Sequence, residues 1–179
     1  MVTVDDMRVI AYHEAGHAIV AWSLGVLLKE IRIEPHGGIC KHALTVNPLL
    51  DPEFMGTDDW MKVKKKALIL LAGEVAELVG SEMARMAGDS EMAELCSYAH
   101  RASSESIVPG SDREELRELV QLTFGDLGAK ANDWIGRTEV EAREIVIGNW
   151  ERVCLLSNAL VDKSVLCGAE AIRIIKMAE

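Results

Sequence analysis

Two histidines and a glutamate lie close together near the start of the chain, in the stretch AYHEAGHAIV at residues 11–20. Residues four apart on a helix share one face, so His13 and His17 can direct their imidazoles at one cation. Neutral imidazole is a good ligand for Zn²⁺. The adjacent Glu14 can accept a proton from water beside the metal and later donate it to a leaving amine. This spacing predicts a zinc site with His13 and His17 as ligands and Glu14 as catalytic base.

The same residues also fit a polar patch on a buried helix, because this five-residue pattern occurs by chance in unrelated proteins. Two features of the segment favour the metal site. The segment is apolar, so both histidines would be partly buried and would need partners, and a metal ion is one such partner. Gly16 inside a helix costs about 1 kcal/mol relative to Ala, which indicates that another element approaches closely there.

The elements around the motif follow from capping and alternation patterns. The segment TVDD at residues 3–6 has the spacing of a capping box and predicts a helix that runs to about Leu24. Alternating apolar residues predict a strand at 28–34, a glycine-rich turn follows at 36–38, and a second strand is expected at 40–46. A small β-hairpin is therefore expected directly after the motif helix.

Helical patterns dominate the rest of the chain, and only 4% of the residues are aromatic. Helices are predicted at about 59–80, within 88–104, at 111–124, at 138–162 and at 168–178. We expect a mainly α fold and a single domain over residues 1–179. Residues 1–107 would hold the metal-site helices and the hairpin, and residues 108–179 would form a C-terminal helical subdomain.

Composition limits the environment and the partners. The net charge of −10 disfavours binding to a phosphate backbone, so no nucleic-acid partner is expected. The four cysteines form no CxxC pair and no secretory signal is visible, which predicts reduced thiols and a cytoplasmic protein. The most apolar run, residues 67–73, is far too short to span a bilayer, so no membrane segment of its own is expected.

Four stretches resemble one known family, in the same order along the chain. AYHEAGHAIV is similar to the zinc-motif helix of the FtsH family of ATP-dependent membrane zinc proteases, and LLAGEVAELVGS at residues 70–81 resembles its LAGRxAEE helix. The stretches at 31–38 and 149–175 resemble the strand and turn after the motif and the C-terminal helices of that family. The resemblance implies the peptidase domain of this family, with Zn²⁺ as cofactor and proteins or peptides as substrates.

The departures from the family shape the expected function. No GxxxxGK[ST] motif and no membrane helices occur in these residues. We therefore expect a stand-alone endopeptidase that cleaves flexible proteins or peptides, as a possible homo-oligomer or with a separate ATPase partner. The strand at 28–34 would offer an edge on which extended substrate pairs. The alternative is a catalytically silent zinc-binding module with a regulatory or assembly role.

The resemblance implies a third ligand, an acidic residue at the start of a later helix, and two residues compete for this role. If Glu91 is the ligand, the following apolar residues form the expected buried stripe. These residues are Met92, Leu95, Tyr98 and Ala99. Placing Asp89 there gives a poorer core face. Glu91 is therefore the expected third ligand, with Asp89 as the alternative and otherwise as a helix N-cap.

Two further carboxylates lie on the helix that resembles LAGRxAEE, at Glu74 and Glu77. A carboxylate that accepts the free N–H of a ligand histidine fixes the tautomer of that histidine. Either residue could serve this purpose, and either could equally lie on a solvated helix face.

Overall fold

The first helix begins and ends as its sequence predicts. The computed structural model describes residues 3–47, 53, 55–105 and 110–178. Helix α1 (Val4–Ser23) starts at a capping box, because the Thr3 hydroxyl accepts from the Asp6 amide and the Asp6 carboxylate accepts from the Thr3 amide. It ends where Gly25 takes a φ of 70°, a conformation that glycine adopts without strain.

The β-structure is a sheet of three strands. Strands β1 (Leu28–Glu34) and β2 (Gly37–His42) form the predicted antiparallel hairpin, and β3 (Val165–Cys167) pairs with the other side of β1. The order is β2-β1-β3, so both edges of β1 are occupied. The expectation that residues 28–34 offer a free edge is therefore wrong, and β2 is the outer strand on the hairpin side. The third strand has three residues, too few for alternation to reveal it.

Helix α2 (Thr57–Ala87) is longer than predicted and is followed by α3 (Ser90–Glu105). The predicted end at Gly80 is wrong, because Gly80 is a packing position inside the helix. A Cβ there would lie 3.3 Å from Cys96 Sγ and 3.5 Å from the Trp150 ring. The helix ends instead at Gly88, whose φ of 80° suits a C-terminal cap.

Besides β3, the described C-terminal part has four helices and a final 3₁₀ turn. They are α4 (Asp112–Phe124), α5 (Ala129–Gly148), α6 (Trp150–Lys163), α7 (Gly168–Ile175) and η2 (Lys176–Ala178). The single helix predicted at 138–162 is two helices, which meet at Asn149, and the Asn149 side chain donates to the Ile145 carbonyl. The expected boundary between residues 107 and 108 lies outside the described residues.

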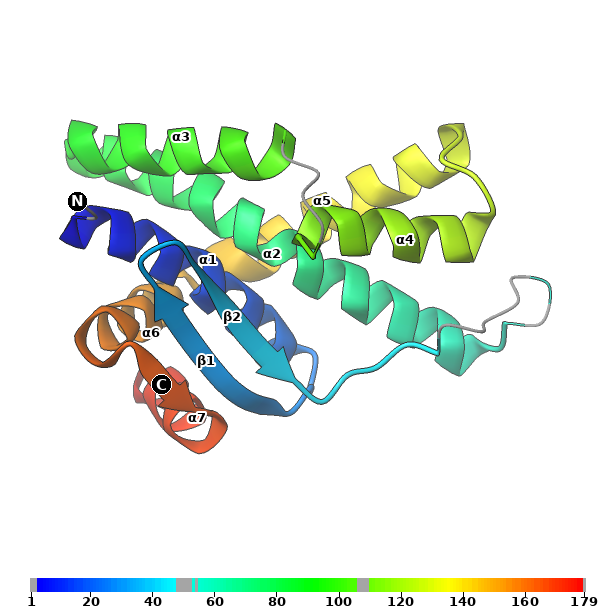
Figure 1. The fold of residues 1–179 in the computed structure, drawn as a ribbon, viewed down its shortest axis with the longest axis horizontal. Coiled ribbons are helices and arrows are strands. Elements are labelled where there is room, and N and C mark those ends of the chain that lie inside the picture. Colours follow the sequence, from blue (N-terminus) through cyan, green and yellow to red (C-terminus); the bar gives the residue numbers. More distant parts are fainter. Residues whose placement is uncertain (1–2, 48–52, 54, 106–109, 179) are drawn as a thin grey trace.

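The core is built on a close crossing of α1 and α2, with the other elements around this pair (Figure 1). A Cβ on Gly16 would lie 2.5 Å from the Ala72 carbonyl oxygen and 2.7 Å from Ala76 Cβ, so the close approach expected at Gly16 is confirmed. Helices α3, α4 and α5 pack on α2, whereas the sheet and α6 pack on α1. The mainly α fold with a small sheet is also confirmed. Within the described residues, no helix has an apolar stretch that could cross a bilayer.

Candidate metal centre

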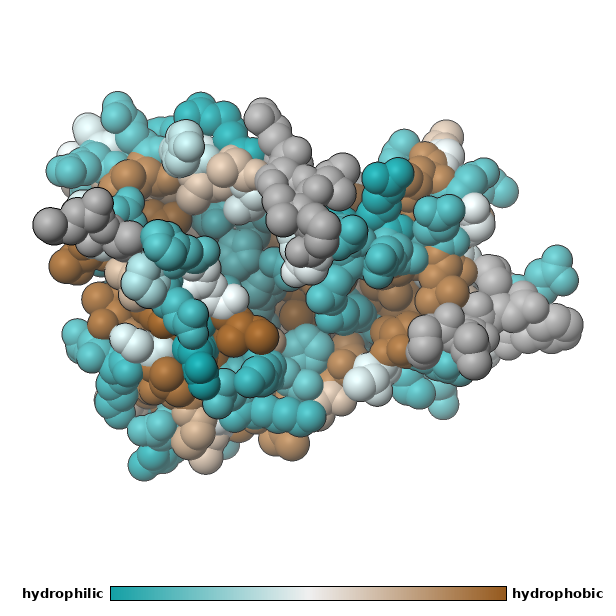
Figure 2. Space-filling model, in the orientation of Figure 1, coloured by the Kyte–Doolittle hydropathy of each residue, from teal (hydrophilic) through white to brown (hydrophobic). Residues whose placement is uncertain are grey.

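The predicted motif residues face a cavity of about 630 Å³ between α1, α2, β2 and the start of α4. Figure 2 shows a hollow with polar surface in this part of the molecule. Glu14 and His17 are buried, and the His13 side chain is 17% exposed. Because the three residues lie within five positions of one helix, α1 alone presents them to the same cavity.

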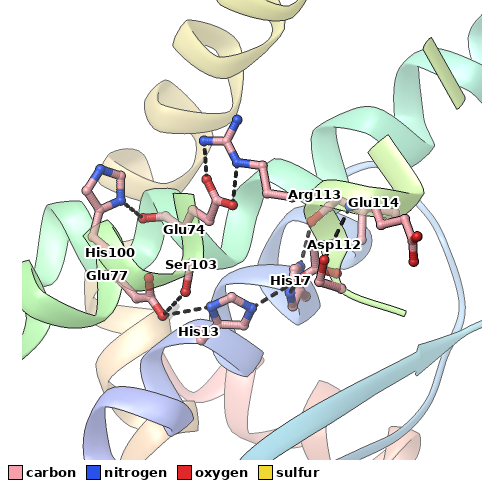
Figure 3. A network of polar contacts seen from close by, with 11 residues as sticks. His13, His17, Glu74, Glu77, His100, Ser103, Asp112, Arg113 and Glu114 are labelled. Carbon is pink, nitrogen blue, oxygen red and sulfur yellow. Dashed lines mark hydrogen bonds and ion pairs between the residues drawn. The ribbon is translucent and has the colours of Figure 1, made fainter. Parts of the chain in front are cut away.

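A third side chain meets the two histidines, and it comes from α4. The Oδ2 atom of Asp112 lies 3.0 Å from His13 Nε2 and 3.1 Å from His17 Nε2 (Figure 3). Asp112 is the first residue of α4, directly after the N-cap Ser111, whose hydroxyl accepts from the Glu114 amide. In the part of the chain that the structure describes, this trio is the one group of three possible ligands with donor atoms close enough to share an ion.

The structure does not bring the expected third ligands to the histidine pair. Glu91 and Asp89 are exposed at the start of α3, and neither lines the cavity. Asp89 caps that helix by accepting from the Met92 amide at 3.0 Å. The site meets α3 near its other end, where Ser103 donates to Glu77. Ser103 is twelve positions beyond Glu91, roughly 18 Å along a helix axis, so Asp112 replaces Glu91 as the acidic neighbour of the pair.

The second nitrogen of each imidazole has its own partner. His13 Nδ1 lies 2.9 Å from Glu77 Oε1, and His17 Nδ1 lies 2.6 Å from the Ile69 carbonyl oxygen. A carbonyl only accepts, so His17 Nδ1 carries a hydrogen. With a neutral ring, the Nε2 lone pair then faces the cavity as a possible metal ligand. Of the two carboxylates considered for this orienting contact, Glu77 makes it, whereas Glu74 pairs with Arg113.

The charges of the trio depend strongly on one another. Burial alone would lower the pKa of His13 and of His17, but the Asp112 carboxylate raises both, and Glu77 raises that of His13 further. Burial would raise the pKa of Asp112, yet the two histidines hold it far below its usual range. The Asp112 carboxylate thus stays ionised and requires positive charge beside it, from imidazolium groups or from a metal ion.

Glu14 lies beside the trio without contributing a donor atom to it. Burial raises the pKa of Glu14, while the positive charge of the histidines counteracts this rise. Its Oε2 atom is buried, and no other residue in the described part of the chain hydrogen-bonds to it. On its other side the carboxylate is covered by β2, where a Cβ on Gly38 would lie 2.7 Å from Oε1. Glu14 lines the cavity, and a carboxylate whose oxygen receives no hydrogen bond is suited to accept a proton from water there.

The donor set fits a small divalent metal ion. Two imidazole nitrogens and one carboxylate oxygen are a known ligand set of catalytic zinc sites, which keep a fourth position for water or substrate. Ligands around a tetrahedral ion with bonds of about 2.0–2.1 Å are about 3.3 Å apart. The observed separations of 3.0 and 3.1 Å between Asp112 Oδ2 and the two Nε2 atoms need only a slight expansion. The cavity then provides the fourth position.

No protein-family model matches the chain, but curated proteins do. This chain is 26% identical over 188 residues to the ATP-dependent zinc metalloprotease FtsH of Magnetococcus marinus. The match covers 94% of this chain and 27% of that protein. The FtsH of Pelobacter propionicus is 26% identical over 194 residues, covering 98% and 30%. The mitochondrial zinc metalloprotease FTSH 8 of Oryza sativa is 22% identical over 187 residues, covering 95% and 22%.

The relatives are named zinc metalloproteases, and at 22–26% identity they are distant ones. The resemblance to the FtsH proteases is confirmed over nearly the whole chain. The chain spans less than a third of the length of these relatives.

Proposed function

We propose that the chain is a zinc-dependent endopeptidase domain that hydrolyses peptide bonds in flexible segments of proteins or peptides. The main support is the convergence of three donor atoms, from His13, His17 and Asp112, beside Glu14 Oε2, which has no hydrogen-bond partner among the described residues. His13, His17 and Asp112 would hold the Zn²⁺. The relatives are all named zinc metalloproteases, which supports zinc as the metal.

Each residue of the site then has a separate task. A bound zinc ion would supply a Lewis acid and lower the pKa of its water. Glu14 would take the proton from the attacking water and pass it to the nitrogen of the leaving amine. Glu77 and the Ile69 carbonyl would keep both imidazoles in the tautomer that presents Nε2.

The outer edge of β2 is the proposed place for substrate backbone. Gly37, Gly38 and Ile39 of this strand line the cavity beside Glu14. An extended peptide that adds a strand to this edge would be held by main-chain hydrogen bonds, with little dependence on its sequence. Methylating single backbone N–H groups next to the scissile bond of a model peptide should therefore raise KM. An unchanged KM at every methylated position would exclude this mode of recognition.

The proposed partners follow from the size of the site. A cavity of about 630 Å³ accepts a peptide segment and not a folded domain, so folded substrates would have to be unfolded first. The relatives are named ATP-dependent, which supports delivery by an ATPase, on the same chain or a separate one. The four cysteines are free, in agreement with a cytoplasmic location.

Zinc content and cleavage of casein, measured on the same protein samples, test the proposal. The wild-type chain should bind one zinc ion and cleave casein. The Asp112→Asn variant should lose both zinc and cleavage. The Glu14→Gln variant should keep zinc but lose at least about 100-fold in kcat, because only the proton transfer is removed. Glu91→Gln is the matched control on an exposed acidic residue and should behave as the wild type.

Other outcomes would point to other functions. A wild-type chain that binds zinc but cleaves neither casein nor peptides would be a silent zinc-binding module. The proposed site would be contradicted if the wild-type chain takes up no zinc. It would also be contradicted if the Asp112→Asn variant binds zinc as tightly as the wild type.

A further inference from the structure

The residue after Asp112 makes a forked ion pair with α2. Arg113 Nε lies 2.7 Å from Glu74 Oε1, and Arg113 Nη2 lies 2.6 Å from Glu74 Oε2 (Figure 3). The Glu74 side chain is 6% exposed and that of Arg113 is 29% exposed. Two parallel N–H···O contacts to a buried carboxylate fix both distance and orientation, unlike a single contact between exposed side chains.

The first turn of α4 is therefore attached in two directions. Asp112 contacts the histidines of α1, while Arg113 grips Glu74 on α2. Both residues sit at the start of the helix, where the position of the backbone decides whether the Asp112 carboxylate reaches the two Nε2 atoms. The Asp112 side chain is 32% exposed, so burial of its own does little to hold it in place.

A second ion pair of opposite polarity supports the same turn. Lys66 on α2 lies 2.8 Å from Glu115 Oε2 on α4. The Lys66 side chain is 24% exposed and that of Glu115 is 47% exposed, so water screens this pair more strongly than the Glu74–Arg113 pair. The Glu74–Arg113 pair is therefore the principal electrostatic attachment of this turn to α2.

We propose that Arg113 is a positioning residue, whose ion pair with Glu74 holds the start of α4 where Asp112 completes the metal site. The inference rests on the proposed function, because it requires Asp112 to be a metal ligand. Groups that orient metal ligands commonly change metal affinity by 10–100-fold when they are removed. Loss of the pair should thus weaken zinc binding although neither side chain touches the ion.

A double-mutant cycle with zinc affinity as the readout tests this role. The apparent Kd for zinc is measured by competition with a chromophoric chelator for the wild type, Glu74→Gln, Arg113→Met and the double variant. Each of the three variants should bind zinc at least about tenfold more weakly, and the double variant no more weakly than Arg113→Met. The matched control is Arg143→Met, which breaks a 2.6 Å ion pair between α5 and Glu82 of α2 outside the cavity and should leave the Kd unchanged.

Thermal unfolding of the metal-free proteins separates positioning from a simple loss of stability. Arg113→Met leaves Glu74 buried without its cation and should lower the Tm, whereas the double variant removes that charge and should recover much of the Tm. Zinc affinity should stay low in the double variant. Recovery of zinc affinity together with the Tm would overturn the positioning role.

Two further variants keep the result decisive. If Arg113→Met does not fold, Arg113→Lys keeps the charge without the fork and should give a smaller loss of affinity than the double variant. An Arg113→Lys or double variant that binds zinc as tightly as the wild type would refute the inference. Failure of the proposed function looks different, because then the wild type binds no zinc or Asp112→Asn binds it normally.

Discussion

The ring of His13 occupies the space that a side chain at position 73 would fill. A Cβ on Gly73 would overlap this ring, with Cε1 2.5 Å away. Gly73 lies inside α2, where an alanine would otherwise be favourable by about 1 kcal/mol. Glycine is thus needed at this position for the contact between α2 and the imidazole, and the Glu77 contact then sets the direction of the ring.

At the scale of single residues, Gly73→Ala should therefore remove zinc. The new methyl group displaces the His13 ring from its place beside Asp112, so zinc affinity should fall by at least about tenfold, as for loss of an orienting contact. Chelator competition measures the fall. Gly136→Ala is the control within α5, where a Cβ meets nothing within 4 Å. It should bind zinc normally and gain about 0.5–1 kcal/mol in the free energy of unfolding. Normal zinc affinity in Gly73→Ala would show that the ring can move without cost.

At the scale of elements, the hairpin is pressed against the motif helix at Gly38. A Cβ there would lie 2.5 Å from Glu14 Cγ and 2.8 Å from the Arg32 carbonyl oxygen of the paired strand. The Gly38→Ala change must therefore shift either the base or the strand. Since Glu14 contributes no donor to the trio, we expect zinc content to stay at the wild-type level while kcat/KM for a peptide falls by about 100-fold. Equal loss of zinc and cleavage would mean that the hairpin supports the whole site and not Glu14 alone.

Whether a site residue can be predicted from the sequence depends on whether it shares a helix with the others. His13, Glu14 and His17 share one helix, which begins at the cap on Thr3, so local spacing predicts their arrangement. The third ligand cannot be found in this way, because Asp112 is 95 positions after His17. The packing of α3 and α4 on α2 decides which of these helices has its first turn beside the histidines.

One signal for Asp112 was present in the sequence. The stretch SDRE at 111–114 predicts a helix start, and Asp112 is an acidic residue in its first turn, as the resemblance to the FtsH family requires. The sequence favours Glu91 because of an apolar stripe, and the structure buries only part of that stripe. Met92 is buried and Leu95 and Ala99 are half-buried, but Tyr98 is 69% exposed.

At the scale of the whole molecule, acidic groups are concentrated around the cavity. Among the described residues, five carboxylates line it, in a chain whose net charge is −10: Glu14, Glu74, Glu77, Asp112 and Glu115. Lys66 balances Glu115. Arg113 balances Glu74, and the histidines balance Asp112 only when they are protonated. A divalent cation would supply that charge with neutral imidazoles, so the folded chain favours cation binding at this point.

This coupling predicts that zinc stabilises the whole fold. The donors come from α1 and α4, so the unfolded chain has no preformed site, and zinc at 100 times its Kd should add about 2.7 kcal/mol to the free energy of unfolding. For a domain of this size that is a rise in Tm of roughly 5–11 °C, which a chelator should reverse. Asp112→Asn should show no rise, whereas Glu91→Gln should match the wild type because Glu91 lies away from the cavity. Differential scanning calorimetry with and without zinc measures this, and a Tm that zinc leaves unchanged in the wild type would mean that α1 and α4 are not joined through a metal.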